Sequence, residues 1–332
     1  MKVLFVCSGN NKSFDIVPFI KAQGESLVRA GVEVDYFPVI GKGIAGYVKA
    51  GFKLRDYLKS NSYDLIHAHF TLSGWSAIIG AAGKTPVVLS LMGSDAYGEY
   101  IGVNKIEFSS RLNILLTYLI QPFVKAIISK SRNIEDYVYL KHKSYIVPNG
   151  INKEKFQPSE TDYRDELGLN NGKKQVLFLG SKTNVRKNFK LVQEAVARLN
   201  RPDVELINPY PIPHTEIPKY LNAVNVLAVT SLMEGSPNVV KEAMACNCPI
   251  VSTDMGDVKW VMGDTEGCYT TSFDPGDYAE KLKLALAFSE TKGRTRGEER
   301  IRKLGLDAGT IANRVVAIYR EALNYKEEKV AG

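Results

Sequence analysis

The sequence predicts an α/β protein with two Rossmann-like domains, each a doubly wound parallel sheet, facing each other across a cleft. Short apolar runs alternate with amphipathic stretches over residues 1–150, which is typical of parallel strands and their crossover helices. A polar, linker-like stretch that ends near Asn171-Gly172 follows, and the same alternation then begins again. With 332 residues, the chain is long enough for two packed domains of about 150 residues each.

The first half begins with the β-branched and aromatic run Val3–Cys7, which ends at Ser8-Gly9-Asn10 as a buried parallel strand would. A helical pattern follows and is closed by Gly31. The further predicted elements are strand Val32–Ile40, helix Tyr47–Ser60, strand Leu65–His69, helix Trp75–Ala82, strand Pro86–Met92, helix Arg111–Ile120, strand Ala126–Ser129, helix Asn133–Leu140 and strand Tyr145–Pro148. The apolar stretch Leu112–Val124 is interpreted as a core helix, with a membrane-interfacial position as the alternative.

The second half repeats the pattern of strand and helix. Its predicted elements are strand Gln175–Leu179, helix Phe189–Leu199, strand Val204–Ile207, helix Ile217–Asn222, strand Val226–Val229, helix Pro237–Ala245, strand Pro249–Ser252, helix Tyr278–Phe288 and a long closing helix, Asp307–Leu323. No sequence repeat relates the two halves, so any duplication is one of fold.

Composition argues against several classes of protein. The four cysteines include no C-x-x-C pair and there are only four histidines, so we expect reduced thiols and neither a disulfide framework nor a structural zinc site. No secretion signal is visible. The longest uncharged stretches, Phe70–Gly83 and Leu112–Val124, are shorter than the ~20 apolar residues that span a bilayer.

The positive charge is concentrated in the first half. Residues 1–150 contain 17 Lys+Arg and 11 Asp+Glu, a balance of +6 out of a net +7. A basic domain attracts phosphorylated substrates, nucleic acid or an anionic membrane face, and a solvated surface excess without a partner is the alternative interpretation. No basic run is interleaved with aromatic residues, so nucleic acid is the partner that the sequence favours least. The basic residues that could rest on an anionic leaflet are Lys49, Lys53, Arg55, Lys59, Lys105 and Arg111.

The most informative segment is Ser231–Glu242, which follows a predicted strand. Ser236 and Pro237 match the residue types of an N-cap and a first helical position, so we expect the helix to begin there. Free N–H groups at a helix start, together with the helix dipole, favour a phosphate. The residues expected to form this site are Ser236, Asn238, Val239 and Val240. The alternative interpretation is that these residues only mark the start of the helix and bind no ligand.

Two glutamates flank this helix start. Glu234 lies in the loop before it, and Glu242 lies one turn inside the helix, where a carboxylate can accept hydrogen bonds from sugar hydroxyls. A second anion site is predicted in the loop Gly180–Asn188, which again follows a strand and precedes a helix. In that loop, Arg186 with a forked contact and Lys187 as a point charge could neutralise a diphosphate leaving group. Solvated surface cations are the alternative.

In order along nearly the whole chain, these features resemble the family-4 retaining glycosyltransferases of the GT-B fold. The segments that carry the resemblance are the E-x7-E pair Glu234 and Glu242, the loop with Arg186 and Lys187, Val147–Ile151, Gly93–Asp95 and the closing helix. The resemblance implies that Glu234 and Glu242 face the donor sugar and the nucleotide ribose, respectively. It also implies that Lys187 holds the donor diphosphate.

The resemblance also implies a division of labour between the domains. Residues 1–157, completed by the terminal helix at about 310–332, would bind the acceptor, and residues 158–309 would bind the nucleotide sugar. The donor side would further include Gly180, Ser181 and Lys182. Ser181 stands where the family often has arginine, so Lys182 or Arg186 would compensate. Met92 replaces a histidine that touches the donor sugar in many members.

On the acceptor or sugar side of the cleft, we expect Gly9, Asn10, His69, Gly93, Ser94 and Asp95. His67 and His69 end a strand, and strand C-termini line the crevice of such sheets. Buried core histidines are the alternative, and His69 is the better ligand candidate of the two. No other histidine or cysteine pattern suggests a metal site.

The predicted activity is transfer of a hexose from a nucleoside diphosphate sugar to a saccharide or lipid-linked saccharide, with retention, in bacterial surface polysaccharide synthesis. The chain contains no Asp-x-Asp, so Lys187 and Arg186 rather than a metal would stabilise the leaving diphosphate, with Glu234 as the third catalytic residue. We expect no cofactor and no metal. The expected location is the cytoplasm, with peripheral contact to the inner face of the plasma membrane.

Three other classes are kept as alternatives. A nucleotide-sugar epimerase could share the fold and the diphosphate site. An NAD-dependent oxidoreductase would use Gly41–Gly46, which matches G-x-G-x-x-G but follows the second strand rather than the first. That loop could equally touch an acceptor phosphate or be a plain turn. A two-domain solute-binding protein would fit the cleft but should carry an export signal.

Overall fold

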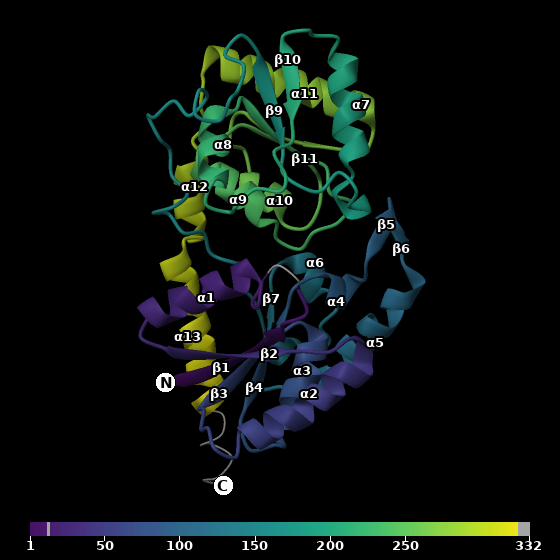
Figure 1. The fold of residues 1–332 in the computed structure, drawn as a ribbon, viewed down its shortest axis with the longest axis vertical. Coiled ribbons are helices and arrows are strands. Elements are labelled where there is room, and N and C mark those ends of the chain that lie inside the picture. The colour runs from purple at the N-terminus through teal and green to yellow at the C-terminus, as the bar shows by residue number, and fades with distance from the viewer. Residues whose placement is uncertain (12–13, 325–332) are drawn as a thin grey trace. The chain divides into compact units, whose positions relative to one another are not determined.

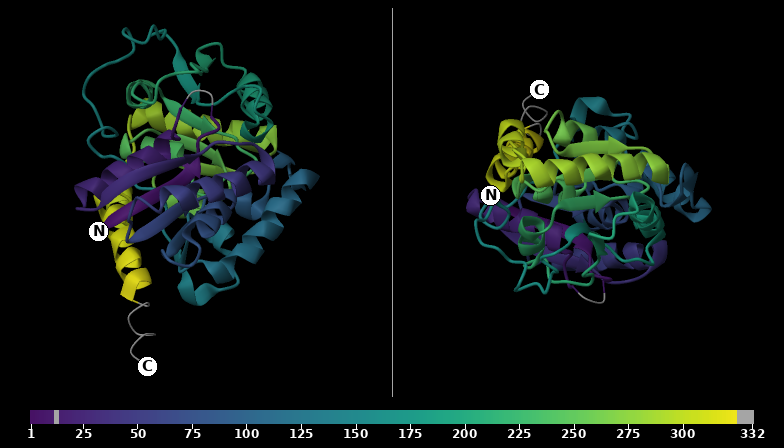
Figure 2. Two further views of the ribbon diagram at one scale, coloured as in Figure 1. Left: turned by 60° about the horizontal axis from the view of Figure 1, so that its bottom comes forward. Right: turned by 90° about the horizontal axis from the view of Figure 1, so that it is seen from above.

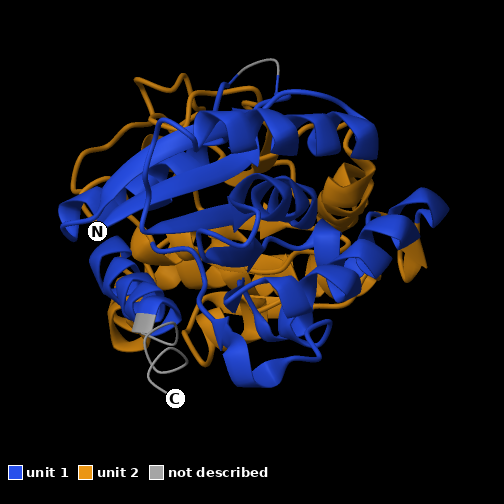
Figure 3. Cartoon of the chain, turned by 90° about the horizontal axis from the view of Figure 1, so that it is seen from below, with its two compact units in different colours: residues 1–99, 107–150, 308–332 blue, residues 100–106, 151–307 orange. Residues whose placement is uncertain are grey.

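The computed structural model describes residues 1–11 and 14–324, which form two compact units (Figure 3). Unit 1 comprises residues 1–99 and 107–150 together with the chain from residue 308 onward, and unit 2 comprises residues 100–106 and 151–307. The chain therefore enters unit 2 after Gly150, seven residues before the boundary expected at residue 157, and returns at Ala308. A short hairpin from the first half also belongs to unit 2.

Unit 1 contains a six-stranded parallel sheet in the order β2-β1-β3-β4-β7-β8. The strands are β1 (Lys2–Ser8), β2 (Glu33–Val39), β3 (Leu65–His69), β4 (Val87–Leu91), β7 (Ala126–Ser129) and β8 (Ser144–Ile146). The central strands β3, β4 and β7 are buried at every position, which explains why their sequences are mainly apolar and contain no charged residue.

The helices of unit 1 are α1 (Pro18–Arg29), α2 (Gly43–Tyr57), α3 (Thr71–Ala81), α4 (Ser94–Tyr97), α5 (Arg111–Ile120), α6 (Arg132–Glu135) and α13 (Ala308–Asn324). The closing helix α13 packs beside α1, so the first and last described helices of the chain belong to the same unit (Figures 1 and 2). The expectation that residues 325–332 continue this helix lies outside the described residues. Among those that are described, no helix combines the length and apolar character needed to cross a membrane.

Unit 2 contains a five-stranded parallel sheet in the order β10-β9-β11-β12-β13. Its strands are β9 (Lys174–Phe178), β10 (Val204–Ile207), β11 (Val226–Val229), β12 (Ile250–Thr253) and β13 (Cys268–Thr271). Its helices are α7 (Phe189–Leu199), α8 (Ile217–Ala223), α9 (Asn238–Ala245), α10 (Val258–Met262), α11 (Pro275–Thr291) and α12 (Gly297–Leu304), with a 3-10 turn η4 (Val185–Lys187). The predicted class, two doubly wound parallel sheets, is confirmed.

The structure adds elements that the sequence did not predict. They are α4, α10, β13, α12 and the hairpin of β5 (Tyr100–Gly102) and β6 (Lys105–Ile106), which contacts η4 within unit 2. The predicted helix Asn133–Leu140 is also much shorter than expected, since α6 ends at Glu135. None of these elements exceeds the eight residues of α12, so they are too short to show a clear periodicity.

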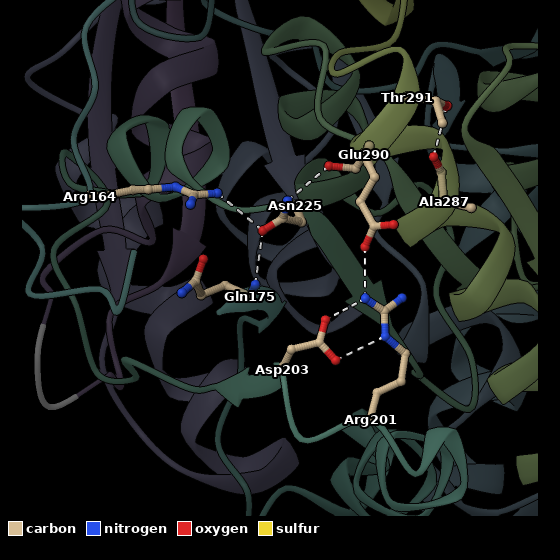
Figure 4. A network of polar contacts seen from close by, with 9 residues as sticks. Arg164, Gln175, Arg201, Asp203, Asn225, Ala287, Glu290 and Thr291 are labelled. Carbon is tan, nitrogen blue, oxygen red and sulfur yellow. Dashed lines mark hydrogen bonds and ion pairs between the residues drawn. The ribbon is translucent and has the colours of Figure 1, made fainter. Parts of the chain in front are cut away.

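Two kinds of contact hold unit 2 together. Apolar side chains of β9, β11, α7 and α11 form one buried cluster that includes Val176, Val192 and Leu282. At the edge of this core, Asn225 accepts hydrogen bonds from the Gln175 backbone N–H and from Arg164, while Arg201 pairs with Asp203 and with Glu290 of α11 (Figure 4). This polar network ties the starts of β9, β10 and β11 to the end of α11.

The strand orders predict where ligands bind. In each sheet the winding reverses beside the first strand, between β1 and β3 in unit 1 and between β9 and β11 in unit 2. The crevice outside the carboxyl ends of two such strands is the usual ligand position in open α/β sheets. In unit 2, this rule places a ligand at the loops that follow β9 and β11.

Candidate functional site

The loops after β9 and β11 are joined by two hydrogen bonds to backbone carbonyl groups of the first loop. Thr230 Oγ1 donates to the carbonyl oxygen of Lys187 at 2.8 Å, and the Leu232 N–H donates to that of Arg186 at 2.8 Å. The Asn184 side chain also accepts from the Arg186 N–H and so starts the turn η4. As a result, the two cations predicted from sequence occupy fixed positions beside the loop that contains Glu234.

The three predicted catalytic residues form one cluster. The carboxylate oxygens of Glu234 each meet one cation, with Oε1 2.7 Å from Lys187 Nζ and Oε2 2.6 Å from Arg186 Nη1. Burial by itself raises the pKa of Glu234, but Lys187 and Arg186 outweigh it and hold the pKa below its ordinary value. Glu234 is therefore ionised at neutral pH.

This cluster remains attractive to anions. Two cations and one carboxylate leave one net positive charge, and the Glu234 side chain is only 15% exposed. In partly desolvated surroundings a fixed positive charge acts more strongly than it does in water. The sequence analysis predicted the individual residues but not their ion pairs, which join positions 47 and 48 residues apart.

The start of the loop after β9 is shaped by Gly180 and Asn208. Asn208 Nδ2 donates to the carbonyl oxygens of Phe178 and Gly180, at 2.9 and 3.0 Å. A Cβ on Gly180 would lie 3.3 Å from Lys187 Cγ, so glycine allows the lysine stem to pass close to the backbone. The sequence analysis did not identify Asn208. The only indication in the sequence is that this residue directly follows the predicted strand Val204–Ile207.

The structure separates the two residues expected to compensate for Ser181. Arg186 belongs to the ion cluster, whereas Lys182 Nζ lies 5.0 Å from the centroid of the Phe189 ring. Ser181 itself shares a hydrogen bond with Thr183. Arg186 is thus the residue that supplies the second positive charge.

The helix start differs from the prediction by one residue. Pro237 rather than Ser236 occupies the N-cap position, α9 begins at Asn238, and no side chain caps it. The prediction of Ser236 as N-cap was wrong because its hydroxyl instead accepts a hydrogen bond from Lys241 Nζ at 2.9 Å. Ser236 therefore faces the interior of the unit, where it fixes the loop.

The free N–H groups at this helix start also need a correction. The Val240 N–H, expected to be available, donates to the Pro237 carbonyl oxygen at 3.3 Å. Asn238 and Val239 occupy the first two helical positions, where the helix supplies no partner for an N–H group. Within residues 1–11 and 14–324, the buried Asn238 Oδ1 has no hydrogen-bond partner. These groups are the ones that a phosphate or hydroxyl would meet.

Two buried ionisable residues, Lys241 and Asp257, contact the loop through hydrogen bonds. Burial lowers the pKa of the fully buried Lys241 to about 8, against the opposing charges of Asp257 and Glu242. The Asp257 N–H donates to the Gly235 carbonyl oxygen at 3.0 Å. A Cβ on Gly256 would lie 2.1 Å from that same oxygen, so only glycine permits this approach. The sequence analysis did not identify Lys241 or Asp257.

Glu242 is positioned by a histidine that the sequence analysis also missed. His214 Nε2 lies 2.9 Å from Glu242 Oε1, and Lys155 Nζ lies 2.8 Å from His214 Nδ1. Because an ammonium only donates, His214 Nδ1 accepts a hydrogen bond from Lys155, and Nε2 donates one to the Glu242 carboxylate. The His214 ring also packs on Phe156, with centroids 5.4 Å apart. Glu242 is thus held in one orientation while its other oxygen keeps its acceptor capacity.

In unit 1, the first loop is bound to the glycine-rich segment. Asn10 both donates to the Gly41 carbonyl oxygen, at 2.7 Å, and accepts from the Gly41 N–H, at 2.9 Å. The Gly9 N–H donates to Val39. Gly41 and Gly46 lie so close that a Cβ on either would meet the backbone of the other within 3.0 Å. This close packing explains Gly41 and Gly46 without a dinucleotide.

The two histidines of β3 have different surroundings. His67 is fully buried and satisfied, with Nδ1 beside Tyr319 Oη and Nε2 2.8 Å from Ser90 Oγ, which supports the interpretation as a core residue. His69 is also buried, with Nε2 3.2 Å from Gln23 Oε1, and its Nδ1 has no partner in the described part of the chain. Burial lowers the pKa of both histidines well below its ordinary value, so both are neutral. His69 stays the better ligand candidate.

The segment Met92–Asp95 is organised around one carboxylate. Asp95 accepts hydrogen bonds from the N–H groups of Met92, Gly93 and Thr71 at 2.8–3.1 Å and is buried. Its role here is to hold the turn between β4 and α4, so any contact with a substrate falls to Gly93 and Ser94. Across the described residues, no three His, Cys, Asp or Glu side chains gather in a way that could hold a metal ion.

Two family models match the sequence. The one described as Glycosyltransferase Family 4 matches residues 2–155, and the one described as Glycosyl transferases group 1 matches residues 175–287. The chain is 25% identical over 247 residues to TuaC of Bacillus subtilis, whose name assigns it as a glycosyltransferase to teichuronic acid biosynthesis. That match covers 66% of this chain and 59% of the length of TuaC.

Solved structures share the fold at low sequence identity. Sucrose-phosphate synthase from Thermosynechococcus elongatus has a TM-score of 0.78 and 19% identity, covering 98% of this chain and 99% of that one. Anabaena HepE, solved in complex with UDP, has a TM-score of 0.72 and 16% identity, covering 97% of this chain and 100% of that one. At these identities the likeness concerns the fold.

Proposed function

Since this chain belongs to glycosyltransferase family 4 and has the GT-B fold, we propose that it transfers a sugar from a nucleoside diphosphate sugar to a saccharide or lipid-linked saccharide. The observation that carries this proposal is the Arg186–Lys187–Glu234 cluster at the winding reversal of the second sheet. A net positive site beside two helix-start N–H groups fits a diphosphate.

In the proposed donor complex, Lys187 and Arg186 bind the diphosphate and the N–H groups of Asn238 and Val239 complete its binding. Glu242 accepts hydrogen bonds from the ribose, and His214 keeps it oriented for this purpose. Glu234 holds the two cations in place and accepts from hydroxyls of the donor sugar. The structural neighbour HepE was solved with UDP bound, which supports a nucleotide as the ligand of this fold.

We propose that the reaction retains the anomeric configuration and needs no metal ion. The bond between the anomeric carbon and the leaving phosphate oxygen breaks, and the acceptor oxygen bonds to the same face of that carbon. The acceptor proton moves to the departing phosphate oxygen, so the diphosphate serves as the base. The charge that develops on this phosphate is stabilised by Lys187 and Arg186.

For the acceptor, we propose a growing surface polysaccharide or its lipid-linked precursor. The name of TuaC supports this class, and the basic balance of the first half supports an anionic setting. The proposed place of action is the cytoplasmic face of the plasma membrane, where the protein would bind peripherally.

A thermal-shift panel with UDP, GDP, ADP, CMP and NAD tests the donor class. A ligand at a hundredfold excess over its Kd adds about 2.7 kcal/mol to the free energy of unfolding, which raises Tm by several degrees. We expect one nucleoside diphosphate to stabilise the wild type and Lys190→Ala but not Lys187→Ala. Lys190 is a matched control because it is an exposed lysine in the neighbouring helix, where it pairs with Glu194 rather than with Glu234.

Product analysis separates the remaining classes. With the selected nucleoside diphosphate sugar and an acceptor, a glycosyltransferase forms a new glycosidic bond. Release of a free, epimerised sugar would favour the epimerase alternative, and stabilisation by NAD alone would favour an oxidoreductase.

A further inference from the structure

Helix α5 presents an apolar stripe to solvent. Five large side chains, spaced by three or four residues from the turn before the helix to the turn after it, are about half exposed or more, and we call them the α5 stripe. They are Phe108 (78%), Leu112 (48%), Leu115 (52%), Leu119 (51%) and Phe123 (62%). This spacing places them along one side of the helix. The sequence-based interpretation of Leu112–Val124 as a core helix was therefore wrong for this side.

The opposite side of α5 anchors the helix. Thr117 and Ile120 are buried, and Thr117 Oγ1 donates to the Asp95 carbonyl oxygen at 2.6 Å. Trp75 Nε1 donates to the Leu116 carbonyl oxygen at 3.3 Å. The helix packs on α3, which itself packs on β3 and β4 (Figure 1). Because α5 is already fixed, its exposed leucines and phenylalanines are not needed to hold the helix in unit 1.

Positive charges border the α5 stripe. The segment from residue 108 to residue 134 contains no Asp or Glu; its exposed cations are Arg111, Lys125 and Arg132, whereas Lys130 is buried just after β7. Arg111 and Lys125 are exposed, and the Arg111 guanidinium lies 5.1 Å from the centroid of the Phe108 ring. The nearest carboxylates along the chain, Glu107 and Glu135, lie just outside this segment. If a second copy of this chain packed against the α5 stripe with the same surface, the positive charges of the two copies would repel each other. An anionic partner surface would instead be complementary to these charges.

A neighbouring helix repeats this arrangement. On α2, which also packs on α3, the side chains of Ile44, Val48 and Phe52 are 37–53% exposed at intervals of four residues. Lys49 and Lys53 are exposed beside them. Contiguous exposed apolar side chains bordered by cations are typical of surfaces that lie in a membrane interface.

We propose that the α5 stripe, with its flanking cations, binds an anionic phospholipid bilayer and lies in the plane of the interface. Leucine and phenylalanine side chains enter the boundary between headgroups and acyl chains, and Arg111 and Lys125 pair with lipid phosphates. The purpose of this membrane contact rests on the proposed function, since the contact would hold unit 1 beside a lipid-linked acceptor. Membrane binding itself needs no donor.

Co-sedimentation with phosphatidylcholine vesicles containing ~30% phosphatidylglycerol, a bacterial-like anionic fraction, tests the proposal. The variants are Leu115→Glu and, as a matched control, Leu284→Glu. Leu284 lies on α11 in unit 2 and is 48% exposed, so the control makes the same chemical change at similar exposure. We expect Leu115→Glu to lower the vesicle partition coefficient by about tenfold or more, since it removes an apolar side chain that would enter the bilayer and adds a negative charge.

The control variant should bind as the wild type does, and Arg111→Gln with Lys125→Gln should weaken binding at low salt. Absence of wild-type binding, or equal loss in both glutamate variants, would overturn the proposal. Sedimentation velocity gives a further contrary outcome: if Leu115→Glu converts a dimer to a monomer, the stripe is a contact between copies. The nucleotide-induced Tm shift should be unchanged in Leu115→Glu, so failure of membrane binding is distinct from failure of the proposed function.

Discussion

Lys187 Nζ lies 2.7 Å from Glu234 Oε1, although 47 residues separate them in the chain. The contact exists because β9 and β11 are adjacent in the sheet, so the loops that follow these strands meet. The contact holds the Lys187 ammonium group in a fixed position beside the start of α9. The proposed donor site depends on this arrangement.

Removing the lysine charge should reduce catalysis more than it reduces protein stability. For Lys187→Met we expect kcat/KM to fall by about 10²–10³, the usual cost of losing one stabiliser of developing charge. The measurement is initial-rate kinetics with the donor selected by thermal shift, with Lys190→Met as the control. Activity within about threefold of the wild type would contradict the proposed role of Lys187.

Glu234 should make folding stability depend on acidic pH. Its pKa is lowered in the folded protein, so the carboxylate contributes stability above its ordinary pKa of 4.5, and this contribution is lost as pH falls through the lower folded value. The free energy of unfolding of the wild type relative to Glu234→Gln should therefore be larger at pH 7 than at pH 3. Urea denaturation at both pH values measures the difference, and an unchanged difference would contradict the ion pairs.

Lys241 should also make stability rise with pH, but on the alkaline side. Its folded pKa is about 8, below its ordinary value of 10.5, so between these values the unfolded chain binds more protons and stability rises with pH. Relative to Lys241→Met/Asp257→Leu, the wild type should gain up to about 1.4 kcal/mol per pH unit from pH 8 to 10. Denaturation curves over this interval give the slope. A difference in free energy of unfolding that does not change between pH 8 and 10 would show that folding does not lower the pKa of Lys241.

The pair of Glu242 and His214 should affect binding of the ribose. We expect His214→Ala and Glu242→Gln each to weaken binding of the selected nucleoside diphosphate by about tenfold, as for loss of one charge-assisted hydrogen bond. Titration calorimetry with the nucleotide and its 2′-deoxy analogue tests the assignment. The losses should be smaller for the analogue if Glu242 binds the 2′-hydroxyl. Equal losses for both ligands would place Glu242 elsewhere than at that hydroxyl.

Much of the fold follows from local sequence. The run Val226–Val229 is entirely apolar and Leu65–His69 lacks charged carboxylates and amines, because both faces of each strand are buried. Phe189–Leu199 has the periodicity of a helix with one buried side. These elements were predicted with the boundaries that the structure shows. The short helices α10 and α12 and the strand β13 carry weaker patterns and were missed.

The site was less predictable because its contacts are non-local. Ser236 followed by Pro237 has the residue types of a helix start, yet the serine hydroxyl accepts from Lys241 and the cap falls one residue later. A lysine in a helix is ordinarily exposed, and only the fold brings Asp257 near it. Likewise, nothing in the sequence near Glu242 signals His214, 28 residues earlier.

The proposed binding of the donor diphosphate by Lys187 and Arg186 can be tested by calorimetry with nucleoside mono- and diphosphates. For the base selected by the panel, the wild type should bind the diphosphate about tenfold or more tightly than the monophosphate, since a second phosphate adds charge-assisted hydrogen bonds. In Lys187→Ala this ratio should fall to about two or less. An unchanged ratio in Lys187→Ala would contradict the assignment of the diphosphate to this cluster.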